Sequence, residues 1–525
     1  MVSLKQAFSI LSKSSIYAVS TIRDDIDHEM HKFKRYLYIE TETQEKFEQE
    51  LSRISSEDII FLCGSSGDGK SELLTRYKKQ YSDQFLFHLD GTHSYKPNET
   101  AIHALDQRFT EYKKSSKPLI IAINTGMLGN YVQDGDDSHE DIRDSISAFL
   151  ASDEPKPNHR FIDFSNRSIL AAGSDSFATK LIEKITDPDE KNPFYKKFIE
   201  ESGLSSVSSV LHTNYRLLSN KSVQKQIDGL LKRLRLQCDQ FITARAALDF
   251  VYELLSDQQY LFDVLFSDSE NELLRHMGQF DPAIVHSHEL DQFNLQFSLN
   301  LLKPSFQACV EKSQEYGVVK FDSAASLLRF MLLMHESFAN QEIKELVSQS
   351  NKSVVTEYIK IWKAHREFSV DVSYRKFLNS FYRDTLVLAI HRYCNRFAQE
   401  LAKGQYFLYE RNGYKVACDL EIKADFKSIQ NTRPCDVGSF KAYFKINDNE
   451  ERMVAVNVNL LDLLYKINQG YRPNKQDKNA ILILDEIVEL IREVGTDMDL
   501  LYIYREAESI KVVNESHEYY EVSVL

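Results

Sequence analysis

The sequence is poor in the residues that mark several classes of protein. Its 525 residues include only 17 glycines, 10 prolines, 6 cysteines and a single tryptophan. With no low-complexity tract and no repeat of solenoid length, this composition excludes collagen-like and solenoid architectures and argues against a long disordered linker. The cysteines are scattered without C-x-x-C spacing, so they indicate neither a zinc site nor a disulfide framework. We expect them to be small buried hydrophobic residues.

Long apolar runs are missing as well. Nowhere do about eighteen consecutive apolar residues occur, and the N-terminal segment MVSLKQAFSILSKSS carries lysines among its apolar residues. We therefore expect a cytoplasmic protein without membrane association. The net charge of −14 argues against a surface coated with phosphate-binding residues, although a local basic groove can exist on an acidic protein. Direct DNA binding thus stays open.

The most specific motif is GSSGDGKS, which follows the apolar run IIFLC and precedes the helix-forming run ELLTRY. Its spacing fits G-x-x-x-x-G-K-[ST], and a strand before it and a helix after it are the context of a phosphate-binding loop. The glycines let backbone N–H groups converge on a polyphosphate, and the positive end of the helix points at the same anion. The residues expected to bind ATP are Gly64, Ser65, Ser66, Gly67, Asp68, Gly69, Lys70, Ser71 and Glu72.

Two side chains of this loop have distinct expected roles. Lys70 would reach the β- and γ-phosphates, and the Ser71 hydroxyl would bind Mg²⁺, which bridges oxygens of the same phosphates. The predicted ligand is therefore ATP with Mg²⁺. The alternative is a glycine-rich turn that binds nothing, which the agreement of motif and context disfavours.

Polar residues end two further predicted strands. The run FLFHLD ends at Asp90 and the run KPLIIAIN ends at Asn124, with an amphipathic helix between them. This alternation predicts an α/β domain whose ligands bind at the carboxyl ends of its strands. We expect Asp90 to act in catalysis and on the Mg²⁺ side, and Asn124 to act as a second polar catalytic residue. Each could instead be an ordinary turn residue at a strand end.

The order of strands, Lys70, Asp90, Asn124 and a later helical region resembles the additional-strand P-loop ATPases, especially the AAA+ group. That resemblance implies an arginine entering from a helical lid, and the candidate is Arg245 in FITARAALDFVYELL. Such an arginine would stabilise charge on the γ-phosphate, whereas a solvated or ion-paired helix residue is the alternative. The sequence departs from the AAA+ pattern because Gly91 follows Asp90 where that group has Glu, which leaves fast hydrolysis open.

Outside the core the patterns are less specific. FKRYLYIET alternates aromatic and aliphatic residues with charges in strand-like fashion, and residues 132–159 are typical of a long surface loop with a short helix. A β-hairpin is predicted around Asn412-Gly413, with SFKAYFKI and MVAVNVNL extending its sheet. The most basic stretch is interpreted as a solvated helix face, and its residues are Lys221, Lys225, Lys232, Arg233 and Arg235.

The run ILILDE near the C-terminus has the form of a hydrophobic strand that ends in an Asp-Glu pair. It continues as IVELIREVG, with apolar residues at helical spacing. We therefore predict an amphipathic helix that places Asp485 and Glu486 on its solvated face.

Together these patterns predict an α/β P-loop NTPase core of the AAA+/additional-strand type, with a helical lid, a helical middle domain and an α+β C-terminal domain. The expected boundaries are 1–45 for an N-terminal extension, 46–175 for the core, 176–266 for the lid, 267–403 for the helical domain and 404–525 for the α+β domain.

Several segments taken together resemble the DptF family, the P-loop component of DNA phosphorothioation-dependent restriction systems. These segments are LCGSSGDGKSELLTRY, HLDGTHSYKPNE, IAINTGMLGNY, ITARAALDFV, FDPAIVHSHELD and GYRPNKQDKNAILILDE. In such systems a host replaces a backbone oxygen of its DNA with sulfur, and a restriction module attacks DNA that lacks the mark.

The resemblance implies an ATP-binding role beside the partners DptG and DptH, with DNA reached through the assembly. No nuclease carboxylate cluster is recognisable, so cleavage would belong to a partner. Two other classes stay open. A stand-alone AAA+-like remodelling ATPase would form a homo-oligomeric ring and need an intact hydrolytic Asp-Glu pair, and a P-loop kinase would turn over ATP only with an acceptor.

Overall fold

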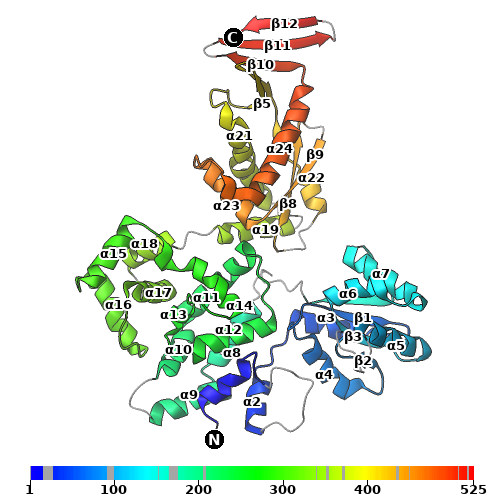
Figure 1. Cartoon of the computed structure of the whole chain (residues 1–525), viewed down its shortest axis with the longest axis vertical. Helices are drawn as coiled ribbons and strands as arrows, with labels where there is room; N and C mark the ends of the chain where they lie inside the picture. The colour runs from blue at the N-terminus through cyan, green and yellow to red at the C-terminus, as the bar shows by residue number, and fades with distance from the viewer. Residues whose placement is uncertain are drawn as a thin grey trace. The chain divides into compact units, whose positions relative to one another are not determined.

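The computed structural model describes residues 2–15, 28–91, 100–151, 153–164, 176–204, 209–338, 340–350, 354–368, 373–432, 437–447, 450–505, 508–516 and 519–525 (Figure 1). The chain forms two compact units. One comprises Met1–Leu234 and Gln240–Lys352, and the other comprises Arg235–Asp239 and Ser353–Leu525. The turn-rich segment expected at 92–99 lies outside the described residues, as does the N-terminal segment 16–27.

The first unit contains a parallel sheet. Its strands are β1 (Ile59–Gly64), β2 (Leu86–His88), β3 (Leu119–Asn124) and β4 (His159–Asp163), in the order β2-β3-β1-β4. β1 is paired along its whole length with β3 and, on its other side, with β4. Every residue of β1 is buried, because a central parallel strand is covered on both faces. The fold is therefore mixed α/β with a parallel sheet, as predicted.

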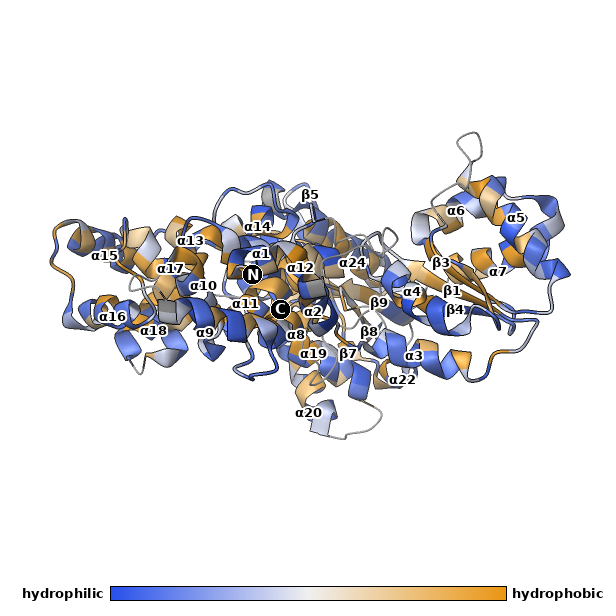
Figure 2. Ribbon diagram, turned by 90° about the horizontal axis from the view of Figure 1, so that it is seen from below, coloured by the Kyte–Doolittle hydropathy of each residue, from blue (hydrophilic) through white to orange (hydrophobic). Residues whose placement is uncertain are grey.

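Helices cover both faces of this sheet. On one face pack α5 (Ala101–Lys114), α6 (Thr125–Asp134) and α7 (Glu140–Ala151). On the other face pack α3 (Glu42–Leu51) and α4 (Lys70–Tyr81). In Figure 2 the strands of this sheet are coloured mainly as hydrophobic, whereas the helices around it combine hydrophilic and hydrophobic residues. This layering leaves the two ends of the sheet as the places where polar groups can meet a ligand.

Two sequence-based expectations for this unit are wrong. The segment 132–159 is not mainly a loop, since α7 has 12 residues and buries Ile142 and Ile146 against the sheet. The many acidic residues of this segment made the helical spacing of these two isoleucines hard to recognise. The segment FKRYLYIET does not form a strand, because its residues up to Tyr36 belong to α2 (His28–Tyr36). Phe33 of α2 packs on Phe194, with ring centroids 4.8 Å apart.

The remaining helices of the first unit form bundles. They are α1 (Leu4–Phe8), α8 (Phe177–Thr186), α9 (Pro193–Leu204), α10 (Val210–Leu218), α11 (Lys221–Gln237, which extends into the second unit's residues), α12 (Ala244–Ser256), α13 (Leu261–Val264), α14 (Glu272–Met277), α15 (His288–Ser298), α16 (Pro304–Glu315), α17 (Ala324–Met334) and α18 (Gln341–Ser350). α12 is central, because it packs against α1, α8, α10 and α14. Helices therefore follow the sheet, as expected for residues 176–266.

The second unit contains two antiparallel sheets. Its strands are β5 (Gln405–Arg411), β6 (Tyr414–Asp419), β7 (Ile422–Ala424), β8 (Phe440–Ile446), β9 (Glu450–Val456), β10 (Leu500–Arg505), β11 (Glu508–Ser516) and β12 (Tyr519–Val524). One sheet has the order β12-β11-β10-β6-β5 and the other β7-β8-β9. The predicted hairpin is confirmed, with Asn412 and Gly413 both at positive φ. The predicted extension of its sheet is wrong, because SFKAYFKI and MVAVNVNL supply strands of the separate β7-β8-β9 sheet.

Helices also complete this unit. They are α19 (Val355–Glu367), α20 (Ser373–Ser380), the π-helix η6 (Phe381–Val387), α21 (Leu388–Cys394), α22 (Phe426–Asn431), α23 (Val458–Asn468) and α24 (Lys478–Thr496). α24 packs on β5 and β6. Gly495 makes this approach possible, since a Cβ there would lie 2.5 Å from Leu408 and 2.7 Å from the Cys418 sulfur. Short 3-10 turns complete the chain, at η1 (Ser9–Leu11), η2 (Asp137–His139), η3 (Gly278–Phe280), η4 (Pro282–Ile284), η5 (His335–Ser337), η7 (Asn395–Phe397) and η8 (Lys475–Asp477).

Candidate nucleotide-binding site

The GSSGDGKS loop connects the carboxyl end of β1 to the first turn of α4, the place that the motif predicts. Gly67 and Gly69 have φ angles of 85° and 90°, which residues with a side chain rarely adopt. Gly69 caps α4 without a side-chain hydrogen bond to the helix. The start of α4 thus directs backbone N–H groups and the positive end of the helix dipole toward the loop.

Two side chains hold the loop in shape. The Ser65 N–H donates to Oδ2 of Asp68 at 2.6 Å, and the Lys70 ammonium donates to the Ser65 carbonyl oxygen at 2.6 Å. Asp68 and Lys70 are each only 6% exposed. The backbone of Ser65 is therefore fixed on both its N–H and its C=O side, while the Ser65 and Ser66 side chains face solvent.

Ser71 connects the loop to the end of β2. Its hydroxyl donates to the Leu89 carbonyl oxygen at 3.0 Å, one residue before Asp90. The next residue, Gly91, donates its N–H to Ala122 of β3 at 2.8 Å. The structure therefore brings Ser71 and the backbone beside Asp90 to the same end of the sheet.

Asn124 ends β3 directly opposite Gly64, its partner in the parallel ladder. It lies at the same sheet end as the loop, as the strand-end argument predicts. Glu72, the last residue of the predicted ATP-binding set, instead faces the N-terminal segment, where its carboxylate lies 3.8 Å from the Lys34 ammonium.

Crowding accounts for the glycine that follows Asp90. A Cβ at position 91 would lie 3.0 Å and 3.2 Å from two side-chain carbons of Ile123. A side chain at this position would require Ile123 of β3 to shift by a few tenths of an ångström. The departure from the AAA+ pattern thus coincides with close packing between residue 91 and β3.

The start of α12 lies on the loop. The Arg245 N–H donates to the Gly67 carbonyl oxygen at 3.1 Å. A Cβ on Gly67 would lie 3.0 Å from Cβ of Arg245 and 3.5 Å from the Thr243 hydroxyl oxygen. Thr243 in turn caps α12 by accepting the Ala246 N–H. The sequence-predicted arginine is therefore a neighbour of the loop, although it lies 178 positions after Gly67 in the sequence.

Asp163 is a residue at this edge that the sequence analysis did not single out. It ends β4 opposite Cys63 of β1, and the following N–H, of Phe164, donates to the Cys63 carbonyl oxygen at 2.8 Å. Burial raises the pKa of the Cys63 thiol, Asp163 adds to that rise and Lys70 opposes it. Asp163 thus lies beside the end of the loop strand. The available signal was the same as for Asp90, an acidic residue at the end of an apolar run.

The electrostatics near Asp90 also involve a buried histidine. Burial and the nearby Arg108 lower the pKa of His88 to about 4, and Asp90 opposes this shift. His88 is therefore neutral at neutral pH. It adds no positive charge to the end of the sheet where the acidic residues gather.

The Asp-Glu pair of ILILDE is not part of this loop. Its run forms α24 of the second unit, which confirms the predicted helix. Asp485 accepts a hydrogen bond from the Tyr393 hydroxyl at 2.8 Å and lies 3.5 Å from Arg396, and Glu486 is exposed. Asp485 therefore has a structural role on its helix.

The basic stretch on α11 is largely neutralised by ion pairs. Lys221 pairs with Glu183 at 2.7 Å, Lys225 with Glu336 at 2.7 Å, Lys232 with Asp228 at 2.5 Å and Arg235 with Asp239 at 2.5 Å. Arg233 lies over the Phe280 ring, 4.2 Å from its centroid. The predicted solvated face is confirmed for Lys221 and Lys225, which are exposed, but is wrong for Arg235, which is buried.

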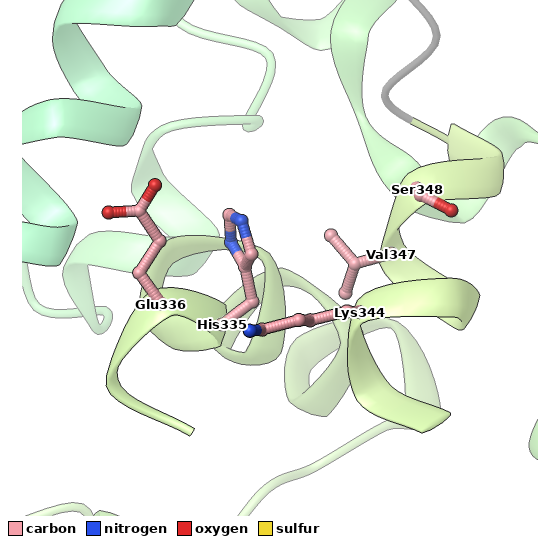
Figure 3. A pocket seen from close by; sticks show the side chains of 5 residues that line it. All are labelled: His335, Glu336, Lys344, Val347 and Ser348. Carbon is pink, nitrogen blue, oxygen red and sulfur yellow. The ribbon is translucent and has the colours of Figure 1, made fainter. Parts of the chain in front are cut away.

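A pocket of the first unit lies between η5 and α18 (Figure 3). His335, Glu336, Lys344, Val347 and Ser348 line it. The polar groups on η5 already have partners, because the His335 Nδ1–H donates to the Leu332 carbonyl oxygen at 2.8 Å and Glu336 pairs with Lys225. In Figure 3 the Glu336 carboxylate points away from Val347. This pocket contains none of the predicted site residues.

Mg²⁺ in nucleotide sites keeps several waters and takes few protein ligands. The residues that would hold it are Ser71 and Asp90, beside the loop. Among the described residues, no group of three or more His, Cys, Asp and Glu side chains is arranged to hold a metal ion. None of the described helices combines the length and hydrophobicity that a membrane span requires.

The geometry thus places a phosphate-loop motif, two polar strand ends and the start of a helix with an arginine at one edge of a parallel sheet. In comparisons with known proteins, no family model, no curated protein and no solved structure matches the chain.

Proposed function

We propose that the chain binds ATP with Mg²⁺ at Gly64–Ser71 and hydrolyses it. The observation that carries the proposal is the loop itself, which joins a buried parallel strand to a helix N-terminus with Lys70 and Ser71 in the first turn. Backbone N–H groups of such a loop bind phosphates, and the lysine and the hydroxyl add a positive charge and a metal ligand.

In this proposal Lys70 contacts the β- and γ-phosphates and Ser71 and Asp90 hold the hydrated Mg²⁺. Asn124 orients the γ-phosphate or the attacking water, and Arg245 stabilises the negative charge that develops during transfer. Supporting this assignment, β3 lies between the loop strand β1 and β2, the strand that ends two residues before Asp90.

We further propose that the chain is the ATP-dependent component of a multi-protein phosphorothioation-dependent restriction system that acts on DNA lacking the modification. This part rests on the sequence resemblance to the DptF family, with DptG and DptH as partners. The large second unit would serve partner binding. Nucleotide could then control the assembly only if its affinity differed between two conformational states of the chain.

A remodelling ATPase similar to the AAA+ group, with no role in restriction, is the second candidate function. The contact between Arg245 and the loop favours it, because such enzymes take an arginine from a helical lid. A P-loop kinase would use the same loop but need an acceptor. Measuring the oligomeric state and ATP turnover with and without DNA separates the three, since a remodeller would form a ring and a kinase would need its acceptor.

The restriction proposal is tested with purified chain, MgATP and DNA with or without phosphorothioate. We expect no cutting by the chain alone. After addition of DptG and DptH, unmodified DNA should be cut and modified DNA spared. Lys70→Ala should abolish this cutting. Cutting by the chain alone, or cutting by the assembly that survives Lys70→Ala, would contradict the proposal.

A further inference from the structure

A carboxylate is built into the phosphate loop. Asp68 lies between Gly67 and Gly69, both at positive φ, and its side chain is 6% exposed. Its Oδ2 accepts the Ser65 N–H at 2.6 Å, while Lys70 contacts the carbonyl oxygen of the same residue. A loop proposed to bind a polyanion therefore contains a buried negative group of its own.

This carboxylate has two separable effects. As an acceptor it holds the turn from Ser65 to Asp68, and an uncharged amide oxygen could accept the same N–H. As a charge it repels any anion bound to the neighbouring N–H groups of Gly69 and Lys70. The repulsion acts in a partly buried place, where charges are screened less than at the surface.

Resting on the proposed nucleotide site, we infer that Asp68 sets the affinity of the loop. Its charge weakens nucleotide binding, and it weakens MgATP more than MgADP because MgATP carries one more negative charge. The loop thereby discriminates against MgATP, the more highly charged nucleotide, and releases it more readily. The hydrogen bond that Asp68 accepts keeps the loop ordered during this exchange.

The substitution Asp68→Asn isolates the charge, because asparagine keeps the acceptor and nearly the same shape. Titration calorimetry should show MgATP binding about tenfold tighter than to the wild-type chain, and MgADP binding tighter by a smaller factor, on the order of threefold. Asp68→Ala removes the acceptor as well, so its gain in affinity should be smaller than that of Asp68→Asn.

A matched control is Asp83→Asn. Asp83 is an exposed aspartate just beyond the other end of α4, so the same change of charge there should leave both affinities unchanged. Thermal unfolding should show that all three variants are folded.

Unchanged or weaker MgATP binding by folded Asp68→Asn would overturn the inference, and so would an equal gain for MgATP and MgADP. The proposed ATP site would still stand in these cases, provided that the wild-type chain binds MgATP and Lys70→Ala does not. If neither the wild-type chain nor Asp68→Asn binds either nucleotide, the proposed function itself fails.

Discussion

The sheet of the first unit and the larger sheet of the second unit differ in how completely helices cover them. The parallel sheet is covered on both faces by helices, so its strands are apolar and its polar residues lie at strand ends. The antiparallel sheet is covered by α24 at β5 and β6, whereas β12, at its edge, is exposed along its whole length. Only the first arrangement concentrates polar groups beside a phosphate loop.

Charge separates the two regions as well. Residues 353–525 contain 24 Lys and Arg against 26 Asp and Glu, a net charge of −2, whereas residues 1–352 contain 40 against 52, a net charge of −12. The proposed nucleotide site, in so acidic a region, would depend on its local cations and N–H groups. The nearly balanced second unit is better suited to approach a polyanion such as DNA, since long-range repulsion is weaker there.

The comparison predicts the largest loss of stability for a central residue of the parallel sheet. Phe61 of β1 is fully buried and stacks on Phe161, with ring centroids 4.6 Å apart. Phe61→Ala should lower the free energy of unfolding of the first unit by about 3–5 kcal/mol, through lost burial and the remaining cavity. Calorimetric unfolding measures this loss. A change below about 1 kcal/mol would show that the sheet is not packed on both faces.

Acid should weaken the second unit through a buried histidine. His365 donates from Nδ1 to the Ile361 carbonyl oxygen at 2.8 Å, and its Nε2 lies 3.2 Å from the Tyr382 hydroxyl. Burial lowers the pKa of His365 from 6.5 to about 4. Between pH 6.5 and 4 the unfolded chain therefore binds a proton that the folded unit excludes, so stability is full above pH 6.5 and falls by on the order of 3 kcal/mol toward pH 4.

Fluorescence of Trp362, the only tryptophan and a buried residue of α19, reports unfolding of this unit. Denaturant titrations from pH 7 to 4 should show a shallower pH slope for His365→Phe than for the wild-type chain, whatever the starting stability of the variant. The exposed-histidine variant His286→Gln should keep the wild-type slope. Identical slopes for His365→Phe and the wild type would contradict the assignment.

Substitutions of Asp90 and Asp485, two aspartates that follow or end apolar runs, should differ in their effect on ATP turnover. Asp90 lies beside the loop at the end of β2, whereas Asp485 is bonded to Tyr393 on a helix of the other unit. Asp90→Asn should slow ATP hydrolysis about a hundredfold while binding persists, because a charged group that positions Mg²⁺ and water is lost. Asp485→Asn should stay within about twofold of the wild-type rate. A loss confined to Asp485→Asn would reverse the assignment.

The smallest effect is expected at the open edge of the antiparallel sheet. Val522 of β12 is 62% exposed, and among the described strands β12 is paired with β11 alone. Val522→Lys should change the free energy of unfolding by no more than about 0.5 kcal/mol, as exposed substitutions do, and lysine is common on edge strands. A loss near 2 kcal/mol, measured by Trp362 fluorescence, would show that β12 is covered.

What the sequence predicted well follows from local rules. The strand-loop-helix context of GSSGDGKS, the hairpin at Asn412-Gly413 and the helix of ILILDEIVELIREVG each depend on a few neighbouring residues. One of the errors arose where two periods overlap. In FKRYLYIET an apolar spacing suited to a strand also fits a helix, and packing of Phe33 on Phe194 decides the outcome.

Other features depend on contacts between distant residues. No local pattern reveals that β8 and β9 form a sheet separate from the hairpin. The sequence alone likewise could not show that a side chain at position 91 would crowd Ile123 or that Arg245 contacts Gly67. Asp163 could have been found by the rule that selected Asp90, applied to each predicted strand in turn.

The most direct test of the nucleotide site is titration calorimetry of MgATP against the wild-type chain, Lys70→Ala and Lys79→Ala. Lys70 is buried in the loop, and Lys79 is an exposed lysine in the last turn of the same helix. We expect saturable binding to the wild type and to Lys79→Ala, and no measurable binding to a folded Lys70→Ala chain, because only Lys70 would contact the phosphates. Undiminished affinity in folded Lys70→Ala would contradict the account.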